Sequence, residues 1–358
     1  MEQKSVLIGM SGGVDSSVAA ALLKEQGYHV IGATMRLWTY SDSCNMKHEG
    51  CCAESAVEDA RRVCDKLGID FYVMNFKDMF KDKVVDYFVD EYIHGRTPNP
   101  CIACNKYLKF DALLKKALAM GIDYVATGHY AKIEKGEDGK YILRASEAVK
   151  KDQSYVLYNF TQEQLAHTLM PLGGYNKDWV RQKAEELGLG VAHKPDSQEI
   201  CFVEDDDYAK FITDYSGYKP KEGDILDVNG NVIGKHRGLI YYTIGQRKGI
   251  GAYGRPMFVM KIDAENNTIT LGEKGMEFSN ELTAYDVNFV SGEFPKENML
   301  ITAKVRYQAP PAAAMLCPQK DGKVKLMFPE PQRAVTPGQA VVFYDGDIVL
   351  GGGTVLQE

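Results

Sequence analysis

The chain has 358 residues, enough for about two or three domains, and 45% of them are apolar and 25% charged. These fractions are ordinary for a soluble globular protein. The formal net charge of −7 argues against diffuse nucleic-acid binding, although it does not exclude a local basic face. The start at Met1 lacks an apolar secretion signal and no apolar run is long enough to span a membrane, so we expect a cytoplasmic protein that contacts no membrane.

The first half of the sequence alternates short apolar strands with amphipathic helices. Strands are predicted at residues 6–9, 29–34, 71–76 and 124–128. Helices are predicted between them, among others at 16–26 and 53–67. This alternation predicts an α/β fold with a doubly wound parallel sheet, in which ligands bind beyond the carboxyl ends of the strands.

Further along, a hairpin is predicted at 133–146, and helices at 161–169 and 177–187. Beyond about residue 218, glycines separate short β-rich pieces, which predict a small β domain with strands at 225–228, 239–244, 257–262 and 268–271. The stretch 282–356 predicts a small barrel, with strands at 300–305, 324–328 and 340–344 that prolines 310–311 and 329–331 separate. We therefore expect a nucleotide-binding domain at 1–217, a central β domain at 218–278 and a C-terminal β-barrel at 279–358.

The run SGGVDSS at residues 11–17 lies between the first predicted strand and the helix after it. In that place, backbone N–H groups and the helix N-terminus point at an anion, and Gly12 and Gly13 let oxygens approach the backbone. The run follows neither the GxxxxGK[ST] nor the GxGxxG pattern. It resembles the PP-loop of ATP pyrophosphatases, which cleave ATP between its α and β phosphates and transfer AMP to an oxygen. A PP-loop alone fits several activities, including argininosuccinate, GMP and NAD synthetases.

Eight cysteines in a chain of this length favour metal or redox chemistry over a disulfide framework. Cys101 and Cys104 lie in a proline-stiffened loop, residues 95–105, that enters a predicted helix, and a helix N-terminus lowers the pKa of a thiol. Cys201 lies in the segment 195–202. Three interpretations remain open, namely buried structural thiols, ligands of zinc or an iron–sulfur cluster, and redox or sulfur-transfer chemistry.

Other segments offer further candidates. Cys44 and His48 with a later cysteine, Cys51 or Cys52, have an irregular zinc-ligand spacing, and a flexible loop near the nucleotide is the alternative. Cys64 falls on an apolar helix face and is predicted to be in the core, whereas Cys317 is predicted in a barrel loop.

Residues 219–255 contain seven Lys or Arg residues and three acidic residues, an excess of four positive charges. This stretch is a candidate basic face for nucleic acid, with a solvated face as the alternative.

Six motifs then occur in a fixed order along the whole chain. They are the PP-loop, NPCIACN at 99–105, KDQSY at 151–155, SQEICF at 197–202, GQRKG at 245–249 and VRY at 305–307. In number, order and spacing they resemble the tRNA-specific 2-thiouridylases, which replace O2 of the wobble uridine in the tRNAs for Lys, Glu and Gln with sulfur. The resemblance implies ATP and Mg²⁺ as cofactors, a tRNA anticodon stem-loop as substrate, and a sulfur donor protein, such as a cysteine desulfurase or a sulfur-relay protein, as partner.

The resemblance also implies roles for single residues. Cys201 would receive sulfur as a persulfide, and Cys104 would be the nucleophile that attacks it and closes a disulfide with Cys201. ATP would be bound by the loop and two further residues, namely Gly9, Met10, Ser11, Gly12, Gly13, Val14, Asp15, Ser16, Met35 and Gly128. The target base and the rest of the tRNA would be contacted by Asn99, Pro100, Cys101, His129, Lys151, Asp152, Gln153, Arg306, Tyr307 and Gln339.

The sequence departs from the family pattern at Cys101, where many members have Asp. Together with Cys104 and Cys201 it forms a set of three thiolates, so the same reaction through a 4Fe-4S cluster is an alternative. Two further hypotheses are a PP-loop enzyme that adenylates a small molecule and a non-catalytic RNA-binding module. An adenylating enzyme of nitrogen transfer would need no cysteine pair.

Overall fold

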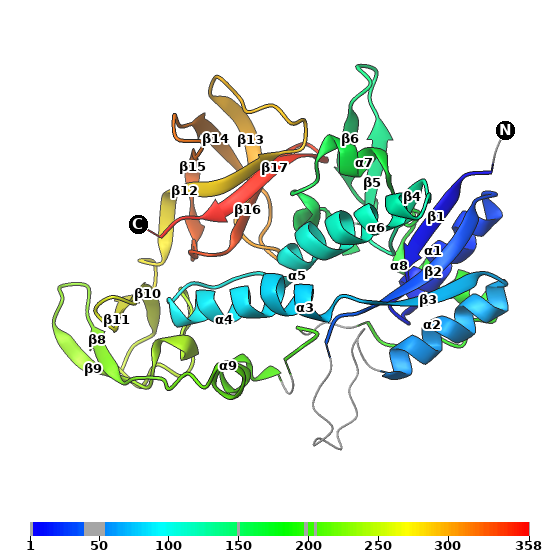
Figure 1. The fold of residues 1–358 in the computed structure, drawn as a ribbon. Helices are drawn as coiled ribbons and strands as arrows, with labels where there is room; N and C mark the ends of the chain where they lie inside the picture. Colours follow the sequence, from blue (N-terminus) through cyan, green and yellow to red (C-terminus); the bar gives the residue numbers. More distant parts are fainter. Residues whose placement is uncertain (1–2, 39–53, 149–150, 197–199, 204–205, 358) are drawn as a thin grey trace.

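The structure is a computed structural model that describes residues 3–38, 54–148, 151–196, 200–203 and 206–357. The predicted zinc ligands Cys44, His48, Cys51 and Cys52 lie outside the described residues. The strands form a five-stranded, a four-stranded and an eight-stranded sheet (Figure 1).

The five-stranded sheet is parallel throughout, with the strand order β3-β2-β1-β4-β7. Its strands are β1 (Ser5–Gly9), β2 (His29–Arg36), β3 (Asp70–Asn75), β4 (Tyr124–Ala126) and β7 (Thr168–Leu169). In β1, Val6, Leu7 and Ile8 are fully buried, and Leu7 belongs to one hydrophobic cluster while its two neighbours belong to another. The predicted doubly wound sheet is confirmed, and both of its faces are covered.

Helices supply the two layers that cover this sheet (Figure 1). On one face, α1 (Val14–Glu25), α2 (Glu54–Leu67) and α8 (Lys177–Glu186) bury residues such as Val18, Ala60 and Val180 in a shared cluster. On the other face, α4 (Asp86–Ile93) and a continuous helical segment contribute buried residues to the second cluster. That segment consists of α5 (Pro100–Ala103), the π-helix η2 (Cys104–Ala112) and α6 (Leu113–Ala119). The chain reaches α4 through α3 (Lys77–Phe80) and η1 (Lys81–Val85).

Two predicted elements are wrong. The segment 161–169 is a helix only in α7 (Gln162–Ala166), and Thr168–Leu169 instead form β7, which pairs in parallel with β4. The segment 239–244 holds a 3₁₀ turn, Leu239–Tyr241, instead of a strand. Ile240 belongs to the cluster of the parallel sheet, whereas Leu239 and Tyr242 belong to the core of the four-stranded sheet. A short apolar run whose side chains enter two different cores has the same composition as a buried strand, so composition alone predicted a strand here.

The four-stranded sheet follows α9 (Tyr208–Ser216) and has the order β10-β11-β8-β9. Its strands are β8 (Gly223–Leu226), β9 (Val232–His236), β10 (Met257–Asp263) and β11 (Thr268–Glu273). The pair β8 and β11 is parallel and the other two pairs are antiparallel.

The third sheet closes into a barrel, because β12 pairs with β17 as well as with β15. The barrel strands are β12 (Phe278–Phe289), β13 (Met299–Lys304), β14 (Ala312–Pro318), β15 (Val324–Arg333), β16 (Ala340–Asp345) and β17 (Ile348–Val355). Pro329 and Pro331 do not end a strand as predicted; they lie within β15, beside a shift of register, where a missing N–H is tolerated. Cys317 lies in β14 and not in a loop.

The predicted hairpin is confirmed as β5 (Ala131–Lys135) and β6 (Tyr141–Ala145), and it extends the barrel sheet through a pairing of Arg144 with Ile348. Nearby, the ring of Tyr158 packs against β17, where a Cβ on Gly352 would lie 2.7 Å from it. The first half of the chain is thus packed directly on the C-terminal barrel.

Candidate active site

The PP-loop is held in one conformation by close packing and by its own hydroxyl groups. Gly12 has φ +70°, and a Cβ there would lie 2.3 Å from the carbonyl oxygen of Ala56, so only glycine fits. Ser16 Oγ accepts from the Ser11 N–H at 3.2 Å and donates to the Gly13 carbonyl at 3.2 Å. Gly13 is the N-cap of α1 and supplies no side-chain cap, which leaves the first N–H groups of the helix to an anion.

The other residues predicted to bind ATP surround this loop. A Cβ on Gly128, which follows β4, would lie 2.7 Å from the backbone nitrogen of Ser16. Met10 is buried, and its N–H donates to the carbonyl of Ala33 in β2 at 2.8 Å. Gly9 ends β1, Val14 begins α1, and Met35 lies near the end of β2. All ten therefore gather at the carboxyl edge, where β1 lies between β2 and β4 and the strand order reverses.

An ion-pair network that sequence reasoning missed lies beside the loop. Lys177 Nζ is 2.8 Å from both carboxylate oxygens of Asp15 and 2.7 Å from Asp196 Oδ1, and only 11% of its side chain is exposed. Asp196 also pairs with Lys151 at 2.6 Å and with Arg181 at 3.4 Å. Burial alone raises the pKa of Asp196, but hydrogen bonds from Lys151 and Lys177 outweigh it and lower the pKa to about 2. Asp196 lies in the segment 195–202 that leads to Cys201, and this position was the sequence signal that could have pointed to it.

Tyr130 joins the loop to the KDQSY segment. Its hydroxyl donates to Asp15 Oδ1 at 2.6 Å, and its N–H donates to Gln153 Oε1 at 3.0 Å. The N–H of Gln153 donates back to the Tyr130 carbonyl at 2.9 Å. Burial, followed by the charge of Asp15, raises the pKa of Tyr130, which keeps the hydroxyl a donor. A residue of the nucleotide loop and a residue predicted to contact tRNA are therefore two hydrogen bonds apart.

The segment predicted to border the target base begins the continuous helix. Asn99 is its N-cap, and Asn99 Oδ1 accepts from the N–H groups of Cys101 at 3.1 Å and Ile102 at 3.3 Å. Pro100 occupies the first helical position, where its missing N–H costs nothing. Cys101 is exposed, whereas Cys104 is buried and begins the π-helix, a form that is frequent at functional sites.

Cys104 belongs to the large hydrophobic cluster on one face of the parallel sheet, and the partly buried Cys201 packs against the same cluster. Next to Cys104, Asn105 Nδ2 donates to the Val156 carbonyl at 3.1 Å, whereas Asn105 Oδ1 is buried without a partner. Cys64 is in the core as predicted, and burial raises the pKa of its thiol to about 12.

Two further residues predicted to contact tRNA, Tyr307 and Gln339, connect the barrel to the parallel-sheet half of the chain. Tyr307 Oη donates to the Asp152 carbonyl at 3.1 Å, and Gln339 Nε2 donates to the Thr97 carbonyl at 3.0 Å. Arg306 is exposed beside Tyr307. His129 Nδ1 lies 2.7 Å from Thr127 Oγ1, and desolvation, followed by the charge of Lys109, lowers the pKa of His129 well below its usual range. In the protein without RNA, this ring is therefore neutral at pH 7.

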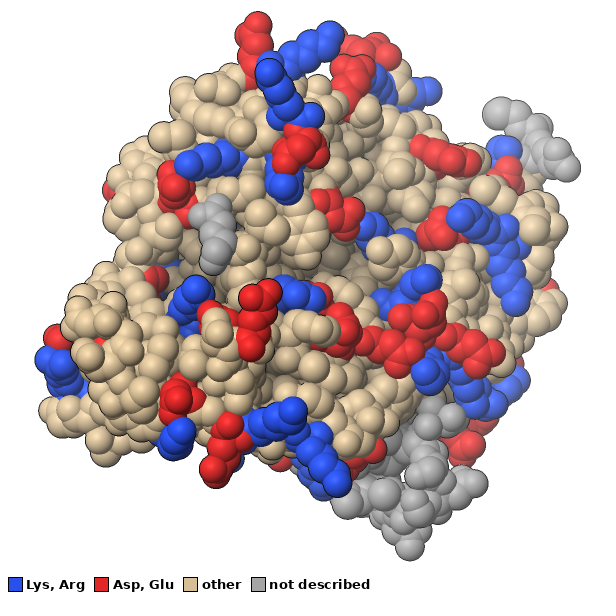
Figure 2. All heavy atoms as spheres, turned by 60° about the vertical axis from the view of Figure 1, so that its left-hand side comes forward, with Lys and Arg blue, Asp and Glu red and all other residues tan. Residues whose placement is uncertain are grey.

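The cations of the basic stretch 219–255 have different surroundings, because some pair with acids and others line a cavity. Lys235 pairs with Asp224 at 2.5 Å and Arg255 with Glu273 at 2.6 Å, so their charges are partly compensated. Gln246, Arg247 and Lys248 line a cavity of about 500 Å³. Positive and negative side chains are interspersed on the face in Figure 2, which shows no broad basic field there.

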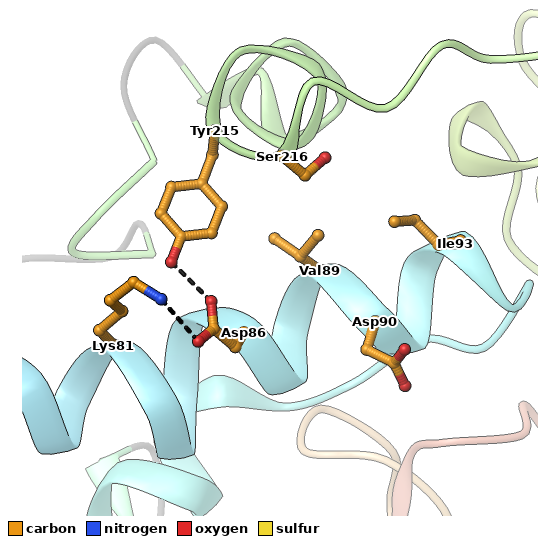
Figure 3. A pocket seen from close by; sticks show the side chains of 7 residues that line it. All are labelled: Lys81, Asp86, Val89, Asp90, Ile93, Tyr215 and Ser216. Carbon is orange, nitrogen blue, oxygen red and sulfur yellow. Dashed lines mark hydrogen bonds and ion pairs between the residues drawn. The ribbon is translucent and has the colours of Figure 1, made fainter.

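A second cavity, of about 430 Å³, lies between α4 and α9 (Figure 3). Asp86 accepts hydrogen bonds there from Lys81 at 2.9 Å and from the Tyr215 hydroxyl at 2.6 Å. Its lining residues include none of those predicted for ATP, tRNA or sulfur.

Among the described residues, no three His, Cys, Asp or Glu side chains are grouped closely enough to hold a metal ion. An iron–sulfur cluster on Cys101, Cys104 and Cys201 stays a prediction. In the described part of the chain, no helix is long and apolar enough to cross a membrane.

Comparisons with known proteins cover almost the whole chain. Models described as a tRNA methyl transferase HUP domain, a tRNA methyl transferase PRC-barrel domain and an aminomethyltransferase beta-barrel domain match residues 4–205, 209–273 and 279–355. The chain is 59% identical to the tRNA-specific 2-thiouridylase MnmA of Acetivibrio thermocellus, over 99% of this chain and 100% of that protein. It is 58% identical to the protein of the same name from Clostridioides difficile, over 98% of both chains.

Among solved structures, the chain is similar to a 4-thiouridine synthetase in complex with RNA and bound ATP. The two share 18% identity and a TM-score of 0.38, over 56% of this chain and 45% of that one, which is too distant for an inference.

The PP-loop lies where the strand order of the parallel sheet reverses, and two β units follow this domain. Together with the family match, this arrangement assigns the chain to the nucleotide-binding PP-loop class of enzymes. Within that class, the chain belongs to the tRNA-specific 2-thiouridylase family.

The ion pairs of Asp196 predict a pH-dependent contribution to stability. A carboxyl whose pKa is lowered from 3.8 to about 2 on folding stabilises the protein above about pH 4, and this contribution is lost as the pH falls through 2. Asp196→Asn should therefore lower the free energy of unfolding at pH 7 by on the order of 1 kcal/mol, after allowance for solvent screening. Urea titrations of both proteins should show the difference shrinking below pH 4. The exposed Asp214→Asn is the control, and an equal difference at pH 7 and pH 2.5 would contradict this origin.

Proposed function

We propose that the protein catalyses ATP-dependent 2-thiolation of the wobble uridine in the tRNAs for Lys, Glu and Gln, in the cytoplasm. The observation that carries the proposal is the hydrogen-bonded connection from Asp15 of the PP-loop through Tyr130 to Gln153. An enzyme of this kind must bring ATP to an oxygen of the RNA that it binds, so its ATP site and its RNA site must adjoin. We place the catalytic domain at 1–217, a tRNA-binding β domain at 218–278 and the β-barrel at 279–358.

The first step is adenylation of the uridine oxygen. A pyrimidine C2 oxygen is a poor leaving group, so it attacks the α-phosphate of ATP, the α–β phosphoanhydride bond breaks and pyrophosphate leaves. The PP-loop and the N-terminus of α1 hold the phosphates. Asp15 is the carboxylate beside the loop that would hold the accompanying Mg²⁺, since Mg²⁺ prefers oxygen ligands. Lys177, which pairs with Asp15 and Asp196 beside the loop, would offer its charge to the phosphates.

The second step brings sulfur to C2. A donor protein leaves a persulfide on Cys201, and the thiolate of Cys104 attacks the Cys201 sulfur. The Cys104–Cys201 disulfide forms, hydrosulfide leaves and attacks C2, and AMP departs with the former O2. The disulfide is then reduced by an external thiol. The break in regular α-helix at Cys104, where the π-helix begins, supports a reactive role for this thiol.

The target uridine must leave its stack to reach this site, at a cost of a few kcal/mol. The exposed ring of Tyr307 and the exposed Cys101 are the groups that would meet it. We propose that local cations hold the stem-loop, Arg247 and Lys248 among them, because both line one cavity.

The loop hydroxyl of Ser16 provides a test of the adenylation step. Ser16→Ala removes the group that organises the PP-loop, so tRNA-dependent pyrophosphate release should fall by about tenfold or more while tRNA affinity stays nearly intact. Asp15→Ala should act in the same direction. Ser216→Ala is the matched control, because this hydroxyl donates to a carbonyl of its own helix, that of Ile212 in α9, at 2.6 Å. Release of phosphate instead of pyrophosphate by the unmodified protein would rule out the assigned reaction.

Cysteine variants separate the persulfide route from a cluster. Cys104→Ala and Cys201→Ala should each abolish thiolation, whereas Cys101→Asp should keep substantial activity with a persulfide donor and reductant. Cys317→Ala, on a barrel strand, is the control. The anaerobically purified protein should work without iron and should accumulate the Cys104–Cys201 disulfide, detectable by mass spectrometry after one turnover. Stoichiometric iron and inorganic sulfide in the active protein would show the cluster route instead.

Salt titrations test the RNA site at the cavity of the GQRKG loop. Replacing both Arg247 and Lys248 by Ala should weaken tRNA binding and flatten its dependence on salt, by about 0.7–0.9 in log–log slope for each phosphate that is no longer neutralised. Arg255→Ala, in which the removed cation is already paired with Glu273, should change both quantities less. Unchanged affinity and slope in the double variant would place the tRNA elsewhere.

A further inference from the structure

Lys304 is a cation at the site that none of the six motifs includes. It is the last residue of β13, and its pairing with Val342 of β16 fixes its backbone in the barrel wall. Its side chain is half-buried, with Nζ 5.8 Å from the ring centre of Tyr307 and 5.9 Å from that of Tyr155. These two rings meet edge to face, 5.7 Å apart.

The surroundings of Lys304 place it between two segments predicted to contact tRNA. The hydroxyl of Tyr307, one of the two flanking rings, donates to the Asp152 carbonyl. Burial is the main cause that raises the pKa of Tyr307, the charge of Asp152 is the second, and Cys101 is close enough to be the third. Lys304 is thus near both the KDQSY segment and the loop of Cys101, at the junction of the barrel with the parallel-sheet half.

The charge of Lys304 is incompletely compensated. Asp152 is the acid close enough to favour its charged form, but the oxygens of Asp152 accept from the N–H groups of Ser146 at 3.0 Å and Ser154 at 3.1 Å and from the Ser154 hydroxyl at 2.8 Å. Among the described residues, no carboxylate forms an ion pair with Lys304. Desolvation lowers the pKa of Lys304, which means that the amine lacks the full compensation that an anion would give it.

We propose that Lys304 binds a backbone phosphate next to the everted target nucleotide, while the exposed ring of Tyr307 stacks on a base. The proposal rests on the proposed function and adds a substrate contact to it. A lysine flanked by aromatic rings is the arrangement that single-stranded nucleic acid favours, since the cation meets the phosphate and a ring meets the base. With 39% of Tyr307 exposed, part of this residue is open to a base from solvent.

The test compares Lys304→Met, which removes the charge at nearly constant length, with Lys304→Arg, which keeps it. Lys323→Met is the matched control, because Lys323 also lies on the barrel but pairs with Asp321 at 2.6 Å. The probe is an unmodified anticodon stem-loop RNA, with binding measured from low to moderate salt. Lys304→Met should weaken binding roughly tenfold and reduce the log–log salt slope by about 0.7–0.9, as expected when one phosphate is no longer neutralised. Lys304→Arg should restore the slope, and Lys323→Met should resemble the unmodified protein.

Thermal unfolding of the same variants separates binding from structure. If Lys304→Met unfolds at a lower temperature while its RNA affinity and salt slope are unchanged, Lys304 only packs between the tyrosines and the proposal is wrong. A weaker affinity with an unchanged slope would also overturn it, because a phosphate contact must release counterions. Failure of the proposed function would appear differently, as absent tRNA-dependent pyrophosphate release in the unmodified protein.

Discussion

Lys177 lies between the carboxylates of Asp15 and Asp196, and the arrangement of the whole site depends on this cation, which is largely shielded from water. One acid belongs to the nucleotide loop and the other to the segment that leads to Cys201. Removing either partner would leave a charge largely shielded from water, which is costly, so the two segments are held at a fixed distance. Lys151 and Tyr130 add the KDQSY segment to the same network.

The barrel contributes to the site through hydrogen bonds with the loop before the continuous helix and with the KDQSY segment. The Thr97 N–H donates to the Pro337 carbonyl at 2.9 Å, and the Tyr155 hydroxyl donates to the Ala340 carbonyl at 2.7 Å. Segments more than 180 residues apart in sequence are thereby joined by hydrogen bonds. A surface built from both halves suits a folded RNA loop, which is recognised by shape and by local contacts to unstacked bases.

The comparison of sequence and structure is most informative where the prediction failed. Strand β1 was predictable because Val6, Leu7 and Ile8 are buried on both faces of the sheet and form a short continuous apolar run. The segment 239–244 has a similar composition, but its side chains divide between two cores, and composition does not record which core a residue fills. Pro329 lies inside β15 because the pairing with β12 is irregular there, which depends on the partner strand.

The sequence by itself determined the PP-loop, the class of sheet, the barrel and the family, because each depends on local pattern or on the order of motifs along the chain. It also named the residues that gather around the loop. Only the tertiary structure decided which charges meet, since Lys177, Asp196 and Lys304 lie in no phosphate-binding pattern and acquire their surroundings from distant segments. The physical reason is that a motif or an apolar periodicity is a property of a few neighbouring residues in the sequence. The electrostatic environment of a side chain is instead determined by all the segments that pack around it.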